Sequence, residues 1–314
     1  MKVLIGYDGS PSADAALDDL QRAGLPADVE AVILMIAEVW LPPPMRDDSP
    51  ENCPPDGSPE QVKKRCDPAK KAVTEAETLS RYAKDRLQSI FPGWKITSVA
   101  ACGSPSRGIL AKADDFKPDL IVVGSQGRTA VSRILLGSIS QKVLTEANCS
   151  VRVARGRIEA APKRTCILIG FDGLSGSMVA VEAVASRFWL ENSEVRLLAV
   201  SDPITPSLIG RFVPPIADLV EEVNEGERER LQELAEPALQ KLKDAGLCAA
   251  LSIVAGNPKQ VLVEEAARWH ADAIFVGANA AGSRIERFLL GSVSAAVAAR
   301  ANCSVEVVRK QLSD

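Results

Sequence analysis

Three short stretches of this sequence combine glycine with groups that bind anions or hydroxyls. Asp8-Gly9-Ser10 and Gly124-Ser125-Gln126-Gly127-Arg128 each follow an apolar run, and Gly137-Ser138-Ile139-Ser140 opens a helical pattern. Glycine lets a backbone approach a ligand closely, and the free N–H groups at a helix start favour phosphate. The Ser138 and Ser140 hydroxyls add donors. Together these stretches predict a phosphate-binding site.

Charged side chains extend this chemistry. Asp8, when ionised, only accepts hydrogen bonds, so it suits a ribose hydroxyl, an adenine amine or a hydrated Mg²⁺. Arg128 or Arg133 can bring positive charge to a phosphate. A second interpretation stays open, because glycines at strand-to-helix turns also serve close packing and Asp8 can simply cap the next helix.

Alternating strand and helix patterns must position these residues. Apolar runs predict strands at 3–7, 29–39, 96–102, 120–124 and 151–154. Caps and helical periodicity predict helices at about 10–23, from Asp67-Pro68 to 90, at 107–115 and at 137–147. This order predicts a five-stranded parallel sheet covered on both faces. Ligands bind such sheets beyond the carboxyl ends of the strands, where the strand order reverses, and Asp8 and Gly124 fall there.

An internal repeat organises the whole chain. Residues 135–155 and 289–309 share 13 identities in 21 positions at an offset of 154. KVLIGYDG at 2–9 matches CILIGFDG at 166–173 at an offset of 164. We therefore expect one α/β domain built twice, at 1–156 and 163–310, with the extra length in a proline-rich insertion at about 41–68.

Composition excludes several classes of protein. The chain has 314 residues, of which 46% are hydrophobic and 25% charged, as is usual for a globular protein. Its net charge of −4 has the wrong sign for a protein that binds nucleic acid through its overall charge. No apolar stretch reaches the roughly 20 residues that span a bilayer, and the N-terminal residues do not resemble a signal peptide. Seven scattered cysteines without a CxxC pair favour a reducing compartment, so we expect a cytoplasmic protein.

The cysteines and the histidine offer little further chemistry. Cys53 and Cys66 lie in the proline-rich insertion, where they can pair, bind a metal or be exposed thiols, but they show no recognisable ligand spacing. Cys149 and Cys303 occupy equivalent positions, and we expect them to pack in the core. The only histidine, His270, lacks a GxSxG elbow or other nucleophile pattern beside it. No GxxxxGK[ST] is present, which excludes an ordinary P-loop ATPase. We expect no metal site.

The glycine spacing carries a family resemblance. Gly124-x₂-Gly127-x₉-Gly137-Ser138 matches the G-x₂-G-x₉-G-[S/T] nucleotide-binding signature of the universal stress protein family. The aspartate after the first strand and the Gly-Ser-x-Ser helix start are also similar to that family. The resemblance covers both copies, so the chain resembles a tandem universal stress protein. Two residues depart from the pattern: Gly6 stands where proline is frequent, and Ala37 where a larger residue is usual.

The resemblance implies a fold and a ligand. The fold is two Rossmann-like (adenine nucleotide alpha hydrolase-like) domains that pair through their last strands into an intramolecular pseudo-dimer. The implied ligand is an adenine nucleotide, with or without Mg²⁺. ATP is the leading candidate, and AMP and ADP are the alternatives. Base and ribose would lie near Asp8, Ala37, Val123 and Gly124. Phosphates would lie near Gly127, Arg128, Gly137, Ser138, Ile139 and Ser140.

The second copy departs further from the signature. Asp172, Gly277, Gly291 and Ser292 persist and define a weaker second site. Ala280 stands where the second glycine belongs, and ten residues instead of nine separate it from Gly291. A positive φ at alanine is strained, although Gly282 can take that role in a shifted loop. We therefore expect nucleotide mainly in the first domain.

Three functions remain open at this point. The first is a stress-response regulatory protein that binds ATP and controls contacts with unknown protein partners. The second is an interaction scaffold of the same fold without a nucleotide. The third is slow ATP hydrolysis or self-phosphorylation, for which Asp8 is the only carboxylate that the sequence places at the site. Association of two chains into a homodimer is also open.

Overall fold

The computed structural model describes residues 1–38, 60–126, 136–155, 164–202, 214–278 and 290–310, without the side chains of 60–70 and 214–217. The N-terminal domain contains β1 (Lys2–Tyr7), β2 (Glu30–Ala37), β3 (Lys95–Cys102), β4 (Leu120–Gly124), β5 (Ser150–Ala154), α1 (Pro11–Asp19), the short 3₁₀ helix η1 (Leu20–Arg22), α2 (Glu60–Ile90), α3 (Pro105–Phe116) and α4 (Ser138–Glu146). Five strands alternate with helices, as the sequence predicts.

The C-terminal domain repeats this order. It contains β6 (Cys166–Phe171), β7 (Glu194–Ser201), β8 (Cys248–Ala255), β9 (Ala273–Gly277), β10 (Ser304–Val308), α5 (Ser175–Ala185), α6 (Pro214–Asp244), α7 (Pro258–Arg268) and α8 (Ser292–Arg300). Both domains therefore have the Rossmann-like fold that the family resemblance implies, built twice as the repeat predicts. The exact domain boundaries at 1–156 and 163–310 stay predictions.

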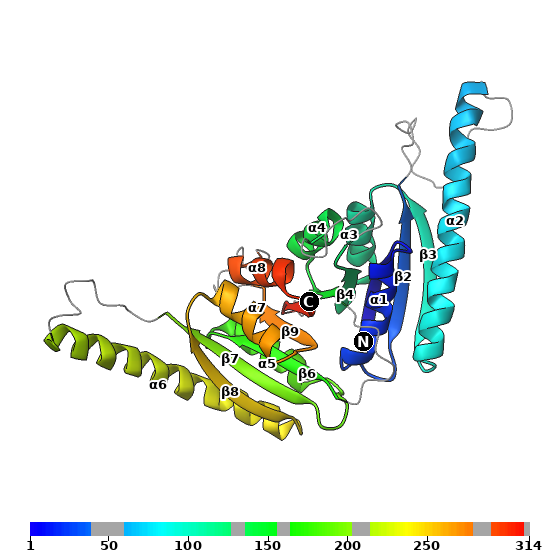
Figure 1. Cartoon of the computed structure of the whole chain (residues 1–314). Coiled ribbons are helices and arrows are strands. Elements are labelled where there is room, and N and C mark those ends of the chain that lie inside the picture. Colours follow the sequence, from blue (N-terminus) through cyan, green and yellow to red (C-terminus); the bar gives the residue numbers. More distant parts are fainter. Residues whose placement is uncertain (39–59, 127–135, 156–163, 203–213, 279–289, 311–314) are drawn as a thin grey trace.

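One ten-stranded sheet joins the two domains, in the order β3-β2-β1-β4-β5-β10-β9-β6-β7-β8. Every pairing is parallel except β5 with β10, which is antiparallel and places Glu306 opposite Arg152. The last strands, which would be open edges in separate domains, thus cover each other. This arrangement is the predicted intramolecular pseudo-dimer (Figure 1).

Helices cover both faces of the sheet. One face carries α3, α4, α7 and α8 over a single hydrophobic cluster that runs through both domains. The other face carries α1 and α2 over one cluster and α5 and α6 over another. The cores are built from the apolar strand residues, such as Ile5, Ile121 and Ile167, which are fully buried. Figure 1 shows α2 and α6 as long helices that extend beyond the sheet.

The start of α2 differs from the prediction. The sequence predicts a helix start at Asp67-Pro68 and a loop up to 68, but α2 begins at Glu60. Glu60, Gln61 and Lys63 are good helix formers, and their propensity offsets the backbone hydrogen bond that Pro68 removes. The proline-rich insertion is therefore shorter than predicted at its end. Cys53 lies outside the described residues, and the side chain of Cys66 is not described.

The two pseudo-equivalent cysteines are part of the packing. Cys149 is 8% exposed, and burial raises the pKa of its thiol to about 11. Burial likewise raises the pKa of the Cys303 thiol to about 12. Both thiols are therefore protonated at neutral pH, which fits the predicted core role and makes them poor nucleophiles.

Candidate functional site

The carboxyl ends of β1, β2 and β4 border a cavity of about 600 Å³ in the N-terminal domain. Strands β2 and β3 extend the sheet to one side of β1, and β4 and β5 extend it to the other, so β1 and β4 flank the reversal of strand order. The cavity is within the range of about 300–1,000 Å³ that holds small-molecule ligands. The sheet thus forms a ligand-sized hollow at the expected place.

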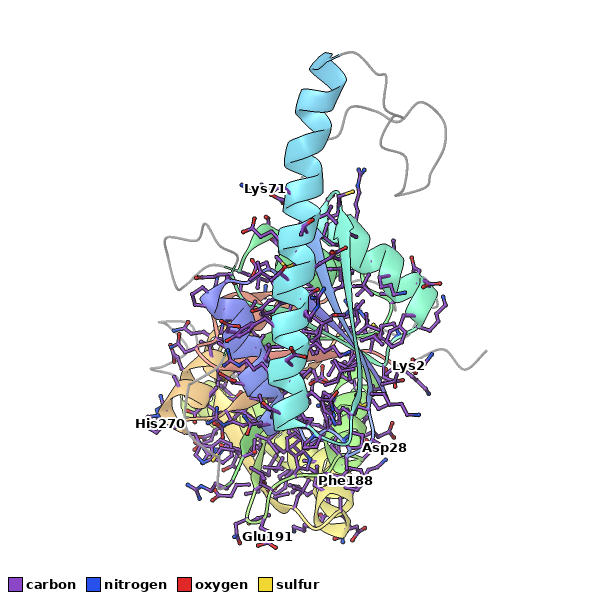
Figure 2. The ribbon with its side chains drawn as sticks, turned by 90° about the vertical axis from the view of Figure 1, so that its right-hand side faces the viewer. Lys2, Asp28, Lys71, Phe188, Glu191 and His270 are labelled. Atoms are coloured by element: carbon purple, nitrogen blue, oxygen red, sulfur yellow. The ribbon has the colours of Figure 1, made fainter. Side chains whose placement is uncertain are left out.

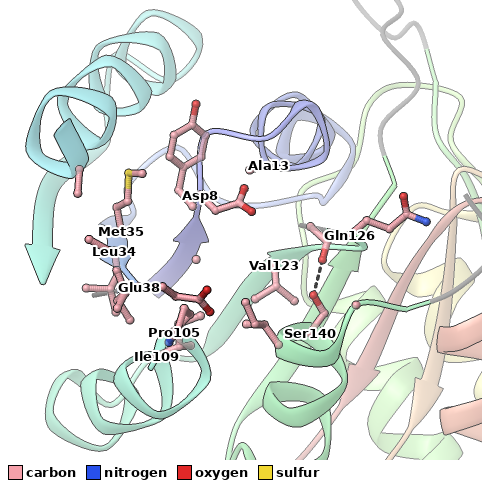
Figure 3. A pocket seen from close by; sticks show the side chains of 18 of the residues that line it. Asp8, Ala13, Leu34, Met35, Glu38, Pro105, Ile109, Val123, Gln126 and Ser140 are labelled. Atoms are coloured by element: carbon pink, nitrogen blue, oxygen red, sulfur yellow. Dashed lines mark hydrogen bonds between the residues drawn. The ribbon is translucent and has the colours of Figure 1, made fainter. Parts of the chain in front are cut away.

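Most of the sequence-predicted residues line this cavity. The structure brings together Asp8, Ala37, Val123, Gly124, Gly137, Ser138, Ile139 and Ser140. Gly127, Arg128 and Arg133 lie outside the described residues, so their predicted contacts stay predictions. Figure 3 shows the carboxylates of Asp8 and Glu38 directed into the same space, with Val123 and Ser140 on its far side.

The start of α4 presents backbone donors to the cavity. Gly137 is the N-cap residue of α4 and, as a glycine, has no side chain that could form a capping hydrogen bond. The first intrahelical bond runs from Gln141 N–H to the Gly137 carbonyl, at 2.8 Å. The N–H groups of Ser138, Ile139 and Ser140 therefore have no acceptor within the helix. This geometry suits an anion, which also interacts favourably with the helix dipole.

Hydrogen bonds hold this helix start against the end of β4. Ser140 Oγ donates to the Gly124 carbonyl at 2.6 Å, and Gly137 N–H donates to the Ser125 carbonyl at 2.8 Å. The single hydroxyl proton of Ser140 is therefore used inside the protein. The hydroxyl of Ser140 thus helps to position α4, and the predicted contact of Ser140 with a phosphate stays a prediction.

Asp8 also has a structural contact. Its Oδ1 accepts a hydrogen bond from Ser10 N–H at 3.0 Å, while Ser10 Oγ caps α1 by accepting from Ala13 N–H at 3.1 Å. The N-cap of α1 is therefore Ser10 and not Asp8, whose contact lies in the turn before the helix. This contact does not exclude a ligand, because a carboxylate has about four acceptor positions. Nearby, Tyr7 Oη donates to Asp14 Oδ1 at 2.8 Å, and burial, together with this bond, raises the pKa of Tyr7 above its usual range.

Several lining residues were missed by sequence reasoning. Among them are Tyr7, Glu38, Pro105 and Ile109 at the strand ends and the start of α3, and Ala72, Glu75 and Ala76 on α2. The statement that Asp8 is the only carboxylate at the site is therefore wrong, because Glu38 and Glu75 also line the cavity. Glu38 directly follows β2 but lies inside the predicted strand at 29–39, and a charged residue near the end of that apolar run was a usable signal. The contribution of α2 depends on how the helix crosses the sheet, which local sequence does not reveal.

The equivalent place in the C-terminal domain keeps the predicted framework. Gly291 is the N-cap of α8, and Ser294 Oγ donates to the Gly277 carbonyl at 2.6 Å. Ser292 begins α8, and Asp172 directly follows β6. Ala280 and Gly282 lie outside the described residues.

Two substitutions and one difference in helix position change the surroundings of this second framework. Ser177 stands where the first domain has Ala13, and its hydroxyl donates to Asp172 Oδ1 at 2.7 Å. Leu231 stands where the first domain has Ala76 and is buried in the core cluster of α5 and α6. The match is secure because the buried positions of both long helices have the same spacing, namely Ala76, Ser80, Ala83 and Leu87, and Leu231, Ala235, Ala238 and Leu242.

The third difference is the distance between the start of α5 and the end of β9. A Cβ atom built on Gly277 would lie 2.4 Å from the Gly176 backbone, whereas one on Gly124 would lie 3.0 Å from the Ser12 carbonyl oxygen. The helix and the strand end are therefore closer together in the second domain. A bulky leucine and a closer helix both reduce the room that a ligand needs.

Other candidate groups lie elsewhere. His270 is exposed at the end of α7, where its φ of 56° matches the φ of 52° at the equivalent Lys117 (Figure 2). It does not line the cavity. Within the described residues, no three metal-ligating side chains gather at one place. No helix in the described part of the chain has the length and apolar character to cross a membrane.

The chain is similar to known proteins over both halves. The family model described as "Universal stress protein family" matches residues 1–155 and again 164–309. Universal stress protein Rv2005c of Mycobacterium tuberculosis is 27% identical over 329 residues, which cover 98% of this chain and 97% of that protein. A universal stress protein of Thermus aquaticus is 31% identical over 157 residues, covering 49% of this chain and 97% of that protein.

A solved structure supports the same assignment of the fold. The crystal structure of a universal stress protein from Archaeoglobus fulgidus has a TM-score of 0.59 and 18% identity to this chain, and it covers 98% of both chains. At this identity the likeness concerns the fold alone. The two family matches, in contrast, span nearly all of the sequence, one for each domain. The chain therefore belongs to the universal stress protein family.

Proposed function

We propose that this protein is a stress-response regulator that binds an adenine nucleotide in the cavity of its N-terminal domain. ATP is the leading candidate for this ligand. One observation carries the proposal: the N-terminus of α4, Asp8 and Gly124 at the end of β4 all line the same cavity of about 600 Å³. The glycine spacing of the family signature is complete in this domain only. The bound or free state of the nucleotide would then control contacts with protein partners.

The cavity divides into regions that suit different parts of a nucleotide. Phosphates suit the backbone donors of Ser138 and Ile139 at the α4 start. Leu34, Ile36 and Ile109 offer apolar surface for a base, and Asp8 offers acceptors for ribose hydroxyls. Ala37, at the end of β2, leaves room beside the base. The smaller residue that departs from the family pattern thus enlarges the cavity.

Mg²⁺ fits the charge of the cavity. Asp8, Glu38 and Glu75 line it, and three carboxylates repel a free triphosphate. A divalent ion that arrives on the phosphates reduces this repulsion and accepts oxygen ligands. We therefore expect tighter binding of ATP with Mg²⁺ than of ATP with EDTA. Equal binding under the two conditions would show that the carboxylates do not face the phosphates.

We expect the nucleotide to bind to the N-terminal domain because the equivalent place in the C-terminal domain differs in three ways. Leu231 replaces Ala76, Ser177 engages the carboxylate of Asp172, and α5 lies closer to β9. Each change reduces the space or the acceptors left for a ligand. We therefore place one nucleotide in each chain.

Nucleotide that co-purifies with the protein distinguishes regulator from scaffold. Freshly prepared protein is denatured, and the supernatant is analysed for adenine nucleotides by chromatography. Titration calorimetry of ligand-free protein with ATP, ADP, AMP and cyclic AMP gives the affinities. Binding of at least one of them supports the proposal, and binding of none favours the scaffold.

A further inference from the structure

Four charged side chains form an alternating line at the junction of the two domains. Asp19, Arg152, Glu306 and Arg187 are 2%, 0%, 0% and 9% exposed, respectively. Arg152 Nε lies 2.6 Å from Asp19 Oδ2, Arg152 Nη1 lies 3.4 Å from Glu306 Oε2, and Arg187 Nη1 lies 2.9 Å from Glu306 Oε2. Arg187 Nη2 also donates to Glu306 Oε1. Each charge therefore has a neighbour of opposite sign.

The central pair occupies the same position in the two copies of the repeat. Arg152 and Glu306 are 154 residues apart, which is the offset of the repeat, and they face each other across the antiparallel pair β5–β10. The flanking pairs, Val153 with Val305 and Val151 with Val307, are symmetric about them. The pseudo-twofold axis thus passes between Arg152 and Glu306, where a true twofold would make a residue face its own copy.

Pairing of two identical domains would therefore bring like charges together. Two N-terminal domains from two chains would place Arg152 against Arg152, and two C-terminal domains would place Glu306 against Glu306. A buried charge is costly without an opposite partner, and juxtaposed like charges are strongly unfavourable. Only the pairing of unlike domains gives both residues a neighbour of opposite charge across the two strands.

The outer charges are also specific to one domain each. Asp19 corresponds to Ala183 in the second copy, and Arg187 corresponds to Ala23 in the first, both at the offset of 164. Asp19 therefore supports Arg152 within the N-terminal domain, and Arg187 supports Glu306 within the C-terminal domain. The four charges alternate in sign along one line only when the two kinds of domain meet.

Two hydrogen bonds between the paired last strands, in contrast, are symmetric. Arg155 N–H donates to Ser304 Oγ at 2.8 Å, and Arg309 N–H donates to Ser150 Oγ at 3.1 Å. These two bonds are equivalent under the repeat, so they would form equally well between like domains. Within the paired strands β5 and β10, the charges thus distinguish like from unlike pairing.

We propose that the last strand of each domain is a charge-coded interaction surface that accepts the other domain type of this chain and rejects a second copy of its own type. Asp19 and Arg152 form the code of one surface, and Glu306 and Arg187 form the code of the other. Specificity then comes from a repulsive element against the wrong partner as well as from attraction to the right one. Two chains that associate do so through other surfaces.

The first test uses full-length variants matched in length but not in charge. Glu306→Lys places a cation opposite Arg152, and Glu306→Met places a neutral side chain there. Hydrogen exchange of the β5 and β10 amides reports opening of the junction. We expect exchange in Glu306→Lys to be faster than in Glu306→Met by about 100-fold. Equal exchange in the two variants would overturn the proposal, because any loss of the carboxylate would then have the same effect.

The second test uses mixing, which does not depend on the stability of either variant alone. Arg152→Glu, combined with Asp19→Ala, carries only acids at the two central positions, and Glu306→Lys, combined with Arg187→Ala, carries only bases there. We expect each variant alone to lack stable pairing and the equimolar mixture to form a one-to-one heterodimer, measured by light scattering after size exclusion. Wild-type chains mixed with either variant serve as the control and should not exchange. A mixture that stays as two separate species would contradict the charge code.

Discussion

At the scale of residues, the two halves of the chain differ most at one position on the long helices. Ala76 lines the cavity of the N-terminal domain, and Leu231 fills the equivalent place in the C-terminal domain. The repeat thus contains its own comparison, and we expect this side chain to limit the space for a ligand in the C-terminal domain. Asp8 and Asp172 have similar turn contacts, so the aspartate alone does not explain the difference.

Ala76→Leu should therefore close the cavity with the residue that the other domain already uses. We expect the affinity for adenine nucleotide to fall at least about tenfold, which corresponds to about 1.4 kcal/mol, because the leucine takes the space of the ligand. Calorimetry measures this change. Thr78→Leu, on the exposed face of the same helix, is the matched control and should bind as the wild type does. Unchanged affinity in Ala76→Leu would place the ligand elsewhere.

The buried thiols predict a loss of stability in alkali. Burial raises the pKa of Cys149 to about 11 and that of Cys303 to about 12, whereas an unfolded thiol ionises near pH 8.5. Above that pH the unfolded state binds fewer protons than the native state, so the free energy of unfolding falls as the pH rises toward 11. Thermal unfolding at pH 8 and pH 10.5 measures the effect. The double variant Cys149→Ala/Cys303→Ala should lose less stability between these two pH values than the wild type.

At the scale of elements, α4 and α8 are built alike but are proposed to differ in function. Each begins after a glycine N-cap, and each is tied to the preceding strand by a serine hydroxyl, Ser140 to the Gly124 carbonyl and Ser294 to the Gly277 carbonyl. Both bonds are 2.6 Å long. The helix start is thus a common structural feature of both domains, and we propose that the surrounding cavity makes the α4 start a binding site.

Ser140→Ala and Ser294→Ala form a matched pair of variants. Each should lower the free energy of unfolding by about 0.5–1.5 kcal/mol, since each removes one equivalent hydrogen bond. Only Ser140→Ala should also weaken nucleotide binding, because it loosens the α4 start that faces the cavity. Denaturant unfolding and calorimetry measure the two effects. Equal loss of nucleotide affinity in both variants would contradict the assignment of the site to the N-terminal domain.

Much of the element order could be predicted from the sequence, since it depends on local patterns. The fourth strand at 120–124 is exact, and the glycine spacing locates the cavity correctly through Gly124 and Gly137. The start of α2 was missed because Asp67-Pro68 is a strong start signal that the helix-forming residues before it override. Glu75 and Ala76 were missed as site residues because their place depends on how α2 packs on the sheet.

At the scale of the whole molecule, two unequal domains share one ten-stranded sheet. The junction at β5 and β10 combines two symmetric hydrogen bonds with an asymmetric line of charges. Burial opposes the charge of Arg152, but Asp19 and Glu306 outweigh it and raise the pKa of the guanidinium. This line of charges could not be predicted from the sequence, because Arg152 and Glu306 come into contact only when β5 and β10 pair.

The number of nucleotides bound by each chain tests the central claim most directly. Ligand-free, full-length protein is titrated calorimetrically with ATP and Mg²⁺. We predict a stoichiometry close to one nucleotide per chain, with binding lost in Ala76→Leu. Two equal sites in each chain, or no binding of any adenine nucleotide, would contradict the claim that the N-terminal domain alone retains the site.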